Sequence, residues 1–383
     1  MPHYKFSDLA YNITDKKMPE PGDERTYIGL EHLDSGSLAV TRWGGEIELK
    51  GQKLVMKKGD ILFGRRNTYL RRAAIAPHDG IFSAHGMIFR PKTEVIDPDY
   101  FPFFIASDYF MNAAIRISVG SLSPTVNWKT LKELEFDIPT LEQQRESAKI
   151  LKAANELKES YQALLLKTDD LVKSQFIEMF GDPETNSKGL RTLMISEVVS
   201  VLRNGATIKQ NKDKEGYPIT RIETISDRTV DREKMGYAGI TSLEKYSDYV
   251  LQDGDILMSH INSITHMGKT ALYKRLPDED IIHGMNLLCL RPIPSIVNPI
   301  YLYRYFQMDY FYQQVMSITK PAVNQASMTI KDLGAQTVLV PDLESQNKYV
   351  EFVEQSDKSK FELKQAIEGV DILIKSMIQQ ELN

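Results

Sequence analysis

The chain has 383 residues, enough for two or three domains, and its hydrophobic share of 42% and charged share of 26% are ordinary for a globular protein. The sequence has no apolar run of membrane-spanning length, no apolar signal region and only one cysteine, Cys289, so we expect a cytoplasmic protein in which Cys289 is a small buried hydrophobic residue. The net charge of −5 argues against a nucleic-acid binder, but Arg42–Lys92 holds eleven Lys or Arg against four acidic residues.

Residues 1–140 are predicted to form one mixed domain of short strands and helices. Gly59 and Asp60 separate the apolar runs 54–56 and 61–63, a pattern typical of a strand, a turn and a second strand. Further strands are expected at 73–76, 81–82 and 86–89, a helix at 100–114, and a short helix or strand at 131–136.

An arginine-rich segment directly follows the apolar run 61–63 and contains no acidic residue. Arginine binds phosphate or the guanine edge, asparagine can read adenine, and hydroxyl groups suit phosphate oxygens. A solvated arginine-rich hairpin tip is the alternative interpretation. The residues predicted to contact DNA are Arg65, Arg66, Asn67, Tyr69, Arg71 and Arg72.

A long helix is predicted from Leu141, because neither Pro nor Gly occurs in the next forty or so residues until Gly181. Its apolar stripe includes Leu165, Val172 and Phe176 at coiled-coil spacing. Gly181 and Pro183 then stand in the order usual for a helix C-terminus.

The second half of the chain repeats the first. Gly-Asp-Ile-Leu recurs 195 residues later at 254–257, His-Gly-Met of 85–87 recurs 198 later at 283–285, and Leu-Glu-x-Gln of 141–144 recurs 202 later at 343–346. The conserved order and slowly drifting offset indicate duplication of a whole domain, too long for a solenoid repeat.

The counterpart of the arginine-rich segment is Met258–Thr270, which has the same position and polarity but different side chains. Two domains on one scaffold with different exposed residues could address two different sequences.

An upstream basic stretch, 203–212, precedes a predicted strand at 217–222. The parallel stretches 121–129 and 320–327 have two possible interpretations, a turn or helix-capping role and contact with phosphate, and both stay open. The second set of predicted DNA contacts is Lys209, Gln210, Lys212, Arg221, Ser259, His260, Asn262, Ser263 and Lys269.

From Leu343 the chain is predicted to be helical again, with a heptad seam of Leu363, Ile367, Val370, Ile374 and Met377. The two helices could each pack on their own domain. Because neither is apolar all round and each seam needs a partner, we favour an antiparallel coiled coil between them.

Motifs for catalysis are absent. The sequence has no phosphate-binding glycine loop, no dinucleotide fingerprint, no amino-methyltransferase motif and no zinc-spaced cysteines or histidines. We therefore expect no catalytic residue, cofactor or metal in this chain. An enzyme with a dispersed site, such as a nuclease, stays an alternative.

The order and duplication of these motifs resemble the specificity (S) subunits of type I restriction–modification systems over essentially the whole chain. The similar segments are 59–70, 82–91, 138–144, 176–183, 254–257, 268–271 and 340–346. The resemblance implies an α+β protein with two similar mixed α/β target recognition domains, separated by two long antiparallel helices that form a coiled coil. The implied boundaries are 1–140 and 183–342 for the domains, and 141–182 and 343–383 for the helices.

The resemblance also implies a function. Each domain would read half of a bipartite, asymmetric double-stranded DNA target, and the helices would act as a ruler and dock two modification subunits. S-adenosylmethionine, ATP and Mg²⁺ are expected on partner subunits, including restriction subunits of a larger complex, and no membrane is involved. The alternative to DNA reading is a duplicated protein-interaction scaffold.

Overall fold

The computed structural model describes residues 1–383 except 46–47, 212–213, 227, 323–324 and 383, and the backbone alone of Leu382. The chain divides into two compact units, Met1–Leu165 with Glu362–Asn383, and Leu166–Phe361. Each unit combines mainly antiparallel sheets, short helices and a part of both long helices. The predicted α+β class, with two similar domains and two long helices, is confirmed.

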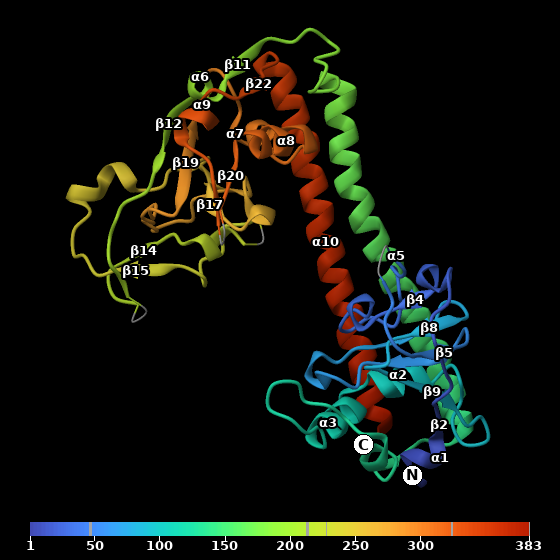
Figure 1. Ribbon diagram of the computed structural model, residues 1–383. Coiled ribbons are helices and arrows are strands. Elements are labelled where there is room, and N and C mark those ends of the chain that lie inside the picture. Colours follow the sequence, from blue (N-terminus) through green and yellow to red (C-terminus); the bar gives the residue numbers. More distant parts are fainter. Residues whose placement is uncertain (46–47, 212–213, 227, 323–324, 383) are drawn as a thin grey trace. The chain divides into compact units, whose positions relative to one another are not determined.

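The first unit contains two four-stranded sheets, in the orders β2-β9-β6-β7 and β3-β5-β8-β4, and a two-stranded sheet of β1 and β10 (Figure 1). Its elements are β1 His3–Lys5, α1 Phe6–Leu9, β2 Ala10–Ile13, β3 Lys16–Lys17, η1 Asp23–Arg25, β4 Tyr27–Ile28, η2 Leu30–His32, β5 Lys53–Met56, β6 Ile61–Phe63, η3 Thr68–Leu70, β7 Ala73–Ile75, β8 Gly80–Phe82, β9 Met87–Pro91, α2 Phe101–Ala106, α3 Asp108–Arg116, α4 Trp128–Leu131 and β10 Glu135–Asp137.

The second unit repeats this plan with a four-stranded sheet in the order β12-β19-β16-β18 and the pair β11-β22, and adds the sheets β13-β15-β14 and β17-β21-β20. Its elements are β11 Thr192–Met194, α6 Ile195–Val198, β12 Val199–Asn204, β13 Gln210–Asn211, β14 Tyr217–Ile219, η4 Ile222–Ile225, β15 Gly236–Ala238, η5 Glu244–Tyr249, β16 Ile256–Ser259, β17 Ile261–Asn262, η6 Ile264–His266, β18 Thr270–Leu272, β19 Leu287–Pro292, α7 Pro299–Tyr305, α8 Asp309–Ile318, β20 Lys320–Pro321, β21 Ala326–Ser327, α9 Ile330–Gly334 and β22 Thr337–Leu339.

The predicted short elements of the first domain are present with one correction. The strands predicted on either side of Gly59 are confirmed as β5 and β6, which belong to different sheets. The helix expected at 100–114 is broken at Ser107, whose side chain accepts a hydrogen bond from the Phe110 N–H and starts α3. The segment 131–136 holds the end of α4 and the start of β10.

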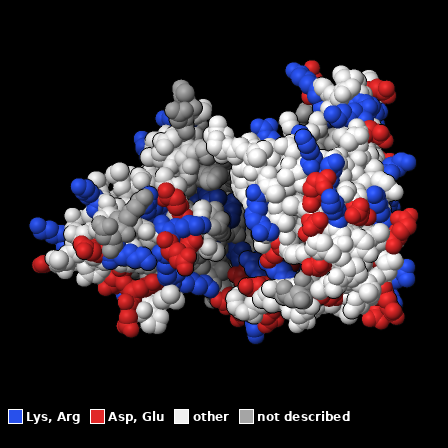
Figure 2. All heavy atoms as spheres, turned by 90° about the horizontal axis from the view of Figure 1, so that it is seen from below, with Lys and Arg blue, Asp and Glu red and all other residues white. Residues whose placement is uncertain are grey.

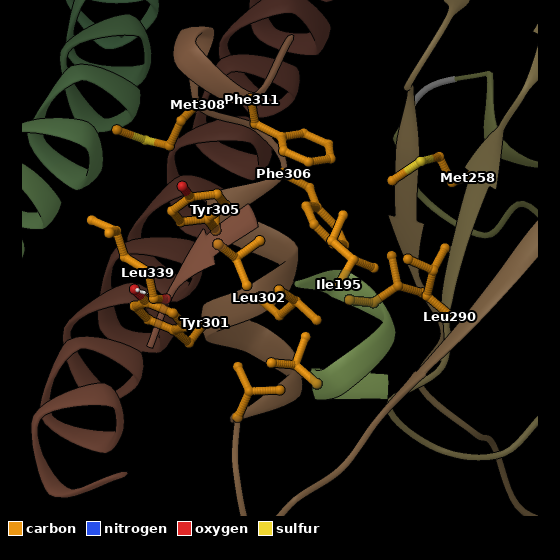
Figure 3. Close-up of a cluster of buried hydrophobic side chains, with 14 of the residues drawn as sticks. Ile195, Met258, Leu290, Tyr301, Leu302, Tyr305, Phe306, Met308, Phe311 and Leu339 are labelled. Atoms are coloured by element: carbon orange, nitrogen blue, oxygen red, sulfur yellow. Dashed lines mark hydrogen bonds between the residues drawn. The ribbon is translucent and has the colours of Figure 1, made fainter. Parts of the chain in front are cut away.

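Each unit has its own aromatic-rich core between the sheet and the helices. In the second unit, Leu302 of α7 lies on the side of Ile195 of α6 and Leu290 of β19, whereas Tyr301 and Tyr305 lie on the opposite side of α7 and contact the Phe176 ring (Figure 3). In the first unit the corresponding cluster is rich in phenylalanine and includes Phe6, Phe63, Phe89, Phe110 and Phe136. Cys289 is buried, as expected.

The repeated Gly-Asp motif holds the hairpin of each sheet in place. Asp60 accepts two hydrogen bonds from the Arg90 guanidinium, at 2.7 and 2.9 Å, and one from the Lys57 N–H. In the second unit, Arg291 donates two bonds of 2.8 Å to Asp255. The preceding glycines, Gly59 and Gly254, have φ of 89° and 86°, a left-handed conformation that favours glycine. The motif therefore belongs to the structural scaffold of each sheet.

The two copies of His-Gly-Met are not structural equivalents. In the first unit, Met87 of β9 is buried and pairs with Phe63 of β6. In the second unit, the residue at the equivalent position of β19 is Leu288, which pairs with Met258 of β16. Met285, three residues earlier, is 47% exposed. The predicted equivalence is wrong because a short identical sequence does not fix strand register.

The long helices are α5 Leu141–Phe180 and α10 Leu343–Leu382, and both begin at Leu-Glu-x-Gln as predicted. Gln144 is fully buried and donates to the carbonyl oxygens of Pro139 and Val95, while its own amide oxygen accepts from the Asp97 N–H. Its counterpart Gln346 makes the same three kinds of bond, to Pro341, Ile296 and Asn298. One buried amide thus ties the start of each helix to its domain.

Within each unit the two helices run antiparallel to one another. In the first unit, Ser147 bonds to Glu381, and Lys158 Nζ lies 2.6 Å from Asp371 Oδ1. In the second, Lys360 pairs with Asp169. The two lysine–aspartate pairs occupy equivalent positions of the duplicated helices, so the pairing pattern is duplicated with the domains.

Loss of the Arg291 side chain should destabilise the second unit, because it leaves the buried carboxylate of Asp255 without its ion partner. For Arg291→Ala we expect a loss of about 3–5 kcal/mol in the free energy of unfolding. The measurement is hydrogen exchange of the β16 and β19 amides. The control Arg275→Ala removes an exposed pair with Asp280 and should cost about 0–1 kcal/mol. Equal protection in both variants would contradict this account.

Candidate nucleic-acid interface

The arginine-rich segment Gly64–Arg72 connects β6 to β7, which pair antiparallel from Ile61 with Ile75 to Phe63 with Ala73. The segment is therefore the connection of a β-hairpin. It contains the turn η3 and two residues in the left-handed conformation, Asn67 at φ 55° and Arg71 at φ 50°. We call it the first loop.

A neighbouring turn holds the first loop by four hydrogen bonds. Arg66 Nε donates to Ser123 Oγ at 2.8 Å, and Ser123 Oγ donates to Asn67 Oδ1 at 2.9 Å. The Asn67 N–H bonds to the Pro124 carbonyl, and the Val126 N–H to the Arg65 carbonyl, at 2.8 and 2.9 Å. Ser123 thus positions both predicted readers, a role that sequence reasoning missed because the two segments lie far apart in the chain.

The six predicted residues of the first loop differ in availability. Arg66 is exposed, and in the described part of the chain its only side-chain bond is made by Nε, which leaves both terminal amino groups uncommitted. Tyr69 is 56% exposed. Arg65 and Arg72 are half-buried, and Arg65 Nε is buried without a hydrogen-bond partner among the described residues. Arg71 Nη1 lies 2.5 Å from Asp108 Oδ1, so α3 supplies the acidic partner that the loop itself lacks.

The second loop, Met258–Thr270, has the same position in its sheet. It connects β16 to β18, which pair antiparallel, and it carries β17 and η6. It also has the equivalent neighbour, because the Met328 N–H bonds to the His260 carbonyl as the Val126 N–H does to Arg65. The prediction of one scaffold with two different loops is confirmed.

Two predicted contacts of the second loop need correction. Ser259 and His260 are 1% and 4% exposed, because both lie where β16 meets the β17–β21 sheet, so neither side chain can reach a ligand as placed. Asn262 is half-buried and donates to Ser259 Oγ at 3.2 Å. Lys269 Nζ donates to the Ser226 carbonyl at 2.6 Å.

The exposed polar groups of the second loop are a cluster of hydroxyl and imidazole groups, beside the exposed side chains of Ile261 and Ile264. Ser263 is exposed, and its hydroxyl lies 3.3 Å from the Thr265 hydroxyl, which lies 2.9 Å from His266 Nδ1. Thr265 and His266 were not among the predicted DNA contacts. Their exposure could not be read from the sequence, because it depends on the turn η6.

The upstream basic stretch is only partly a loop. Lys209 and Gln210 are exposed, but Gln210 belongs to β13, and Arg203 lies in β12 with its guanidinium 4.4 Å from the centre of the Tyr249 ring. Arg221 is half-buried with Glu223 3.4 Å away. The predicted contact Lys212 lies outside the described residues.

The predicted helix-interface residues lie along the seams. Val172 and Phe176 are in the core of the second unit. Ile374 and Met377 pack against the core of the first unit. Leu165, Leu363, Ile367 and Val370 are half-buried.

Charge on the surface is mixed in sign: Figure 2 shows Lys and Arg interspersed with Asp and Glu over the visible face. No cluster of three potential metal ligands occurs among the described residues, and within them no helix is long and apolar enough to cross a membrane. Burial lowers the pKa of His260 and of His283 to about 4, so both imidazoles are neutral at pH 7.

Comparison with known proteins places these features in a family. The model of the type I restriction modification DNA specificity domain matches residues 14–165 and again 188–369. A putative type I restriction enzyme MjaX specificity subunit from Methanocaldococcus jannaschii is 41% identical over 189 residues, which are 49% of this chain and 44% of that protein. The EcoKI specificity subunit of Escherichia coli K12 is 26% identical over 327 residues, covering 79% of this chain and 68% of that protein.

Solved structures share the fold along the whole chain. The S subunit of the type I restriction-modification system of M. genitalium has a TM-score of 0.57 at 13% identity and covers 100% of this chain and 96% of its own. A chain from a study of complex assembly and conformational transition of the type I R-M system has a TM-score of 0.58 at 18% identity, covering 100% and 97%.

The neutral state of His260 predicts a pH-dependent stability. Between its ordinary pKa of 6.5 and about 4, the unfolded chain binds more protons than the folded chain, so stability falls as the pH falls through this range. We expect the thermal midpoint of His260→Gln to change less between pH 7 and pH 5 than that of the unsubstituted chain. The exposed His266→Gln should keep the original pH dependence, and an unchanged dependence in His260→Gln would refute the assignment.

Proposed function

This chain belongs to the family of type I restriction modification DNA specificity domains, and from this membership we propose that it recognises a bipartite double-stranded DNA sequence. One recognition domain reads each half-site, and the chain itself catalyses no reaction. Methylation, with its S-adenosylmethionine, and ATP- and Mg²⁺-dependent restriction belong to partner subunits.

The observation that carries the proposal is the contrast between scaffold and loops. The hairpin, its Asp–Arg pair and the backbone bond that the loop accepts from the neighbouring segment recur in both units. The loops on these hairpins present arginine, asparagine and tyrosine in one unit, and serine, threonine and histidine in the other. A shared frame with different readers suits an asymmetric target.

Arg66 is the strongest candidate for a base contact. Its Nε donates a hydrogen bond to Ser123 Oγ, and this bond orients the guanidinium. The two terminal amino groups take no part in the bond. A guanidinium oriented in this way can donate two hydrogen bonds to O6 and N7 of guanine. Arg71, in contrast, is committed to Asp108 and acts inside the domain.

The acidic total of the chain fits a subunit that binds DNA tightly only within a complex. We propose that two modification subunits add the positive charge that surrounds the DNA. Ile150, Leu157 and Leu164 recur every seven residues on the part of α5 that belongs to the first unit and are 44–54% exposed, which suits an apolar docking stripe for a helix of such a subunit. The role of helix length as a ruler between half-sites stays a prediction.

Replacement of Arg66 tests direct readout. Arg66→Ala should cost about 1–3 kcal/mol of binding and relax the sequence requirement at one position of one half-site only. The measurement is methylation-site sequencing of DNA from cells that co-express the chain with its modification subunits. The control is Lys58→Ala. Lys58 is exposed and precedes β6, whereas Arg66 follows β6, so its replacement should leave the recognised DNA sequence unchanged. Equal weakening on every sequence would instead make Arg66 a phosphate contact.

Replacement on the α5 stripe tests docking. Leu157→Glu places a charge in the proposed apolar contact and should reduce co-purification of modification subunits at least tenfold. Gln162→Glu adds the same charge at an exposed position off the stripe and should leave co-purification intact. Normal assembly of the Leu157→Glu chain would rule out the stripe as the docking surface.

A further inference from the structure

The turn beside the first loop carries an unusual side chain at its tip. Val119 and Thr125 pair across the turn through two backbone bonds of 3.1 and 2.9 Å, and Gly120 takes φ of 111°. Leu122 lies at the tip and is 98% exposed, the highest value among the exposed large hydrophobic residues of the described chain. Val119 on the same turn is 61% exposed.

A single exposed leucine is ordinary on a protein surface and by itself indicates nothing. Here, however, Leu122 is next to Ser123, whose hydroxyl bonds to Arg66 and Asn67. The turn is also bonded to the first loop by the backbone at Pro124 and Val126. Leu122 is therefore held at a defined place relative to the proposed readers.

The chemistry around Leu122 suits a polyanion. No acidic residue occurs between Asp108 and Glu133, a stretch that contains Arg116, Lys129 and Lys132, and none occurs in the first loop. The hydroxyl groups of Ser118, Ser123 and Thr125 donate hydrogen bonds within the domain, whereas Ser121, directly beside Leu122, is exposed. A hydroxyl group such as that of Ser121 can bind a phosphate next to an inserted apolar side chain.

We propose that the turn Val119–Thr125 is a second DNA-reading element of the first domain, in which Leu122 enters a base step as an apolar wedge beside the base that Arg66 contacts. The inference rests on the proposed DNA recognition and extends it. Apolar wedges of this kind partly unstack a base step, and flexible pyrimidine–purine steps yield at the lowest energetic cost. The half-site of this domain is thus expected to contain such a step next to the position read by Arg66.

A wedge accounts for the exposure of Leu122 better than contact with a thymine methyl group does. Contact with one methyl group covers one side of a leucine, whereas insertion between bases removes most of its surface from water. The equivalent turn of the second unit includes residues 323–324, which lie outside the described residues, so the proposal is limited to the first domain.

The test uses the complex of the chain with its modification subunits and a duplex carrying the mapped target, with 2-aminopurine at each position of the first half-site in turn. Besides any rise at the base that a modification subunit flips out for methylation, unstacking by Leu122 should raise 2-aminopurine fluorescence at one further step upon binding. Leu122→Ser should abolish this rise and weaken binding about 10- to 100-fold, since burial of one leucine is lost. Leu122→Met should retain both signals.

The matched control is Leu276→Ser, which replaces a leucine that is 49% exposed just before the turn at 277–278 of the second unit and should change neither signal. Unchanged fluorescence and affinity in Leu122→Ser would overturn the wedge while leaving the proposed function intact. A loss of affinity upon replacing thymine by uracil, without that further fluorescence rise, would also overturn it in favour of a methyl contact. Failure of the unsubstituted complex to bind any mapped target would instead refute the proposed function itself.

Discussion

The ion pair between a buried aspartate and a strand arginine is the interaction on which each recognition domain depends. Asp60 binds Arg90 and caps the turn before β6, and Asp255 binds Arg291 before β16. Both pairs act at the beginning of the hairpin strand, and the variable loop leaves from its other end. Because the strand is anchored away from the loop, loop residues can differ between the copies without disturbing the sheet.

The long helices are also held by interactions that are equivalent in the two units. Gln144 and Gln346 satisfy the carbonyl and amide groups at the start of each helix with identical bonding patterns. Lys158 with Asp371, and Lys360 with Asp169, put one charged pair in each half of the seam. Half-buried charged pairs contribute little net stability. A shift in register between the two helices would, however, leave a lysine without its aspartate in an apolar seam. The pairs therefore favour one register.

Inside the loops, the structure separates arginines that build the domain from those that can serve a ligand. Arg71 is neutralised by Asp108 of α3, whereas Arg66 is oriented by Ser123 with its terminal amino groups uncommitted. The second loop has no equivalent arginine, and its exposed polar groups are those of Ser263, Thr265 and His266. Recognition by the two domains must therefore rest on different chemistry, which supports an asymmetric DNA target.

The sequence by itself determined the duplication, the α+β class, both long helices and the hairpin position of the two loops, because periodicity, Gly-Asp turns and helix-ending glycines act over a few residues. Only the tertiary structure decided which side chains of the loops are available. Ser259 and His260 are buried, where Ser259 pairs with Leu287 of β19 and the His260 carbonyl accepts from the Met328 N–H; Arg66 is oriented by Ser123, 57 residues away. Strand pairing likewise decided that Met87 and Met285 do not occupy equivalent positions in the two units. Burial and hydrogen bonding between distant segments depend on three-dimensional packing, and no local pattern in the chain encodes them.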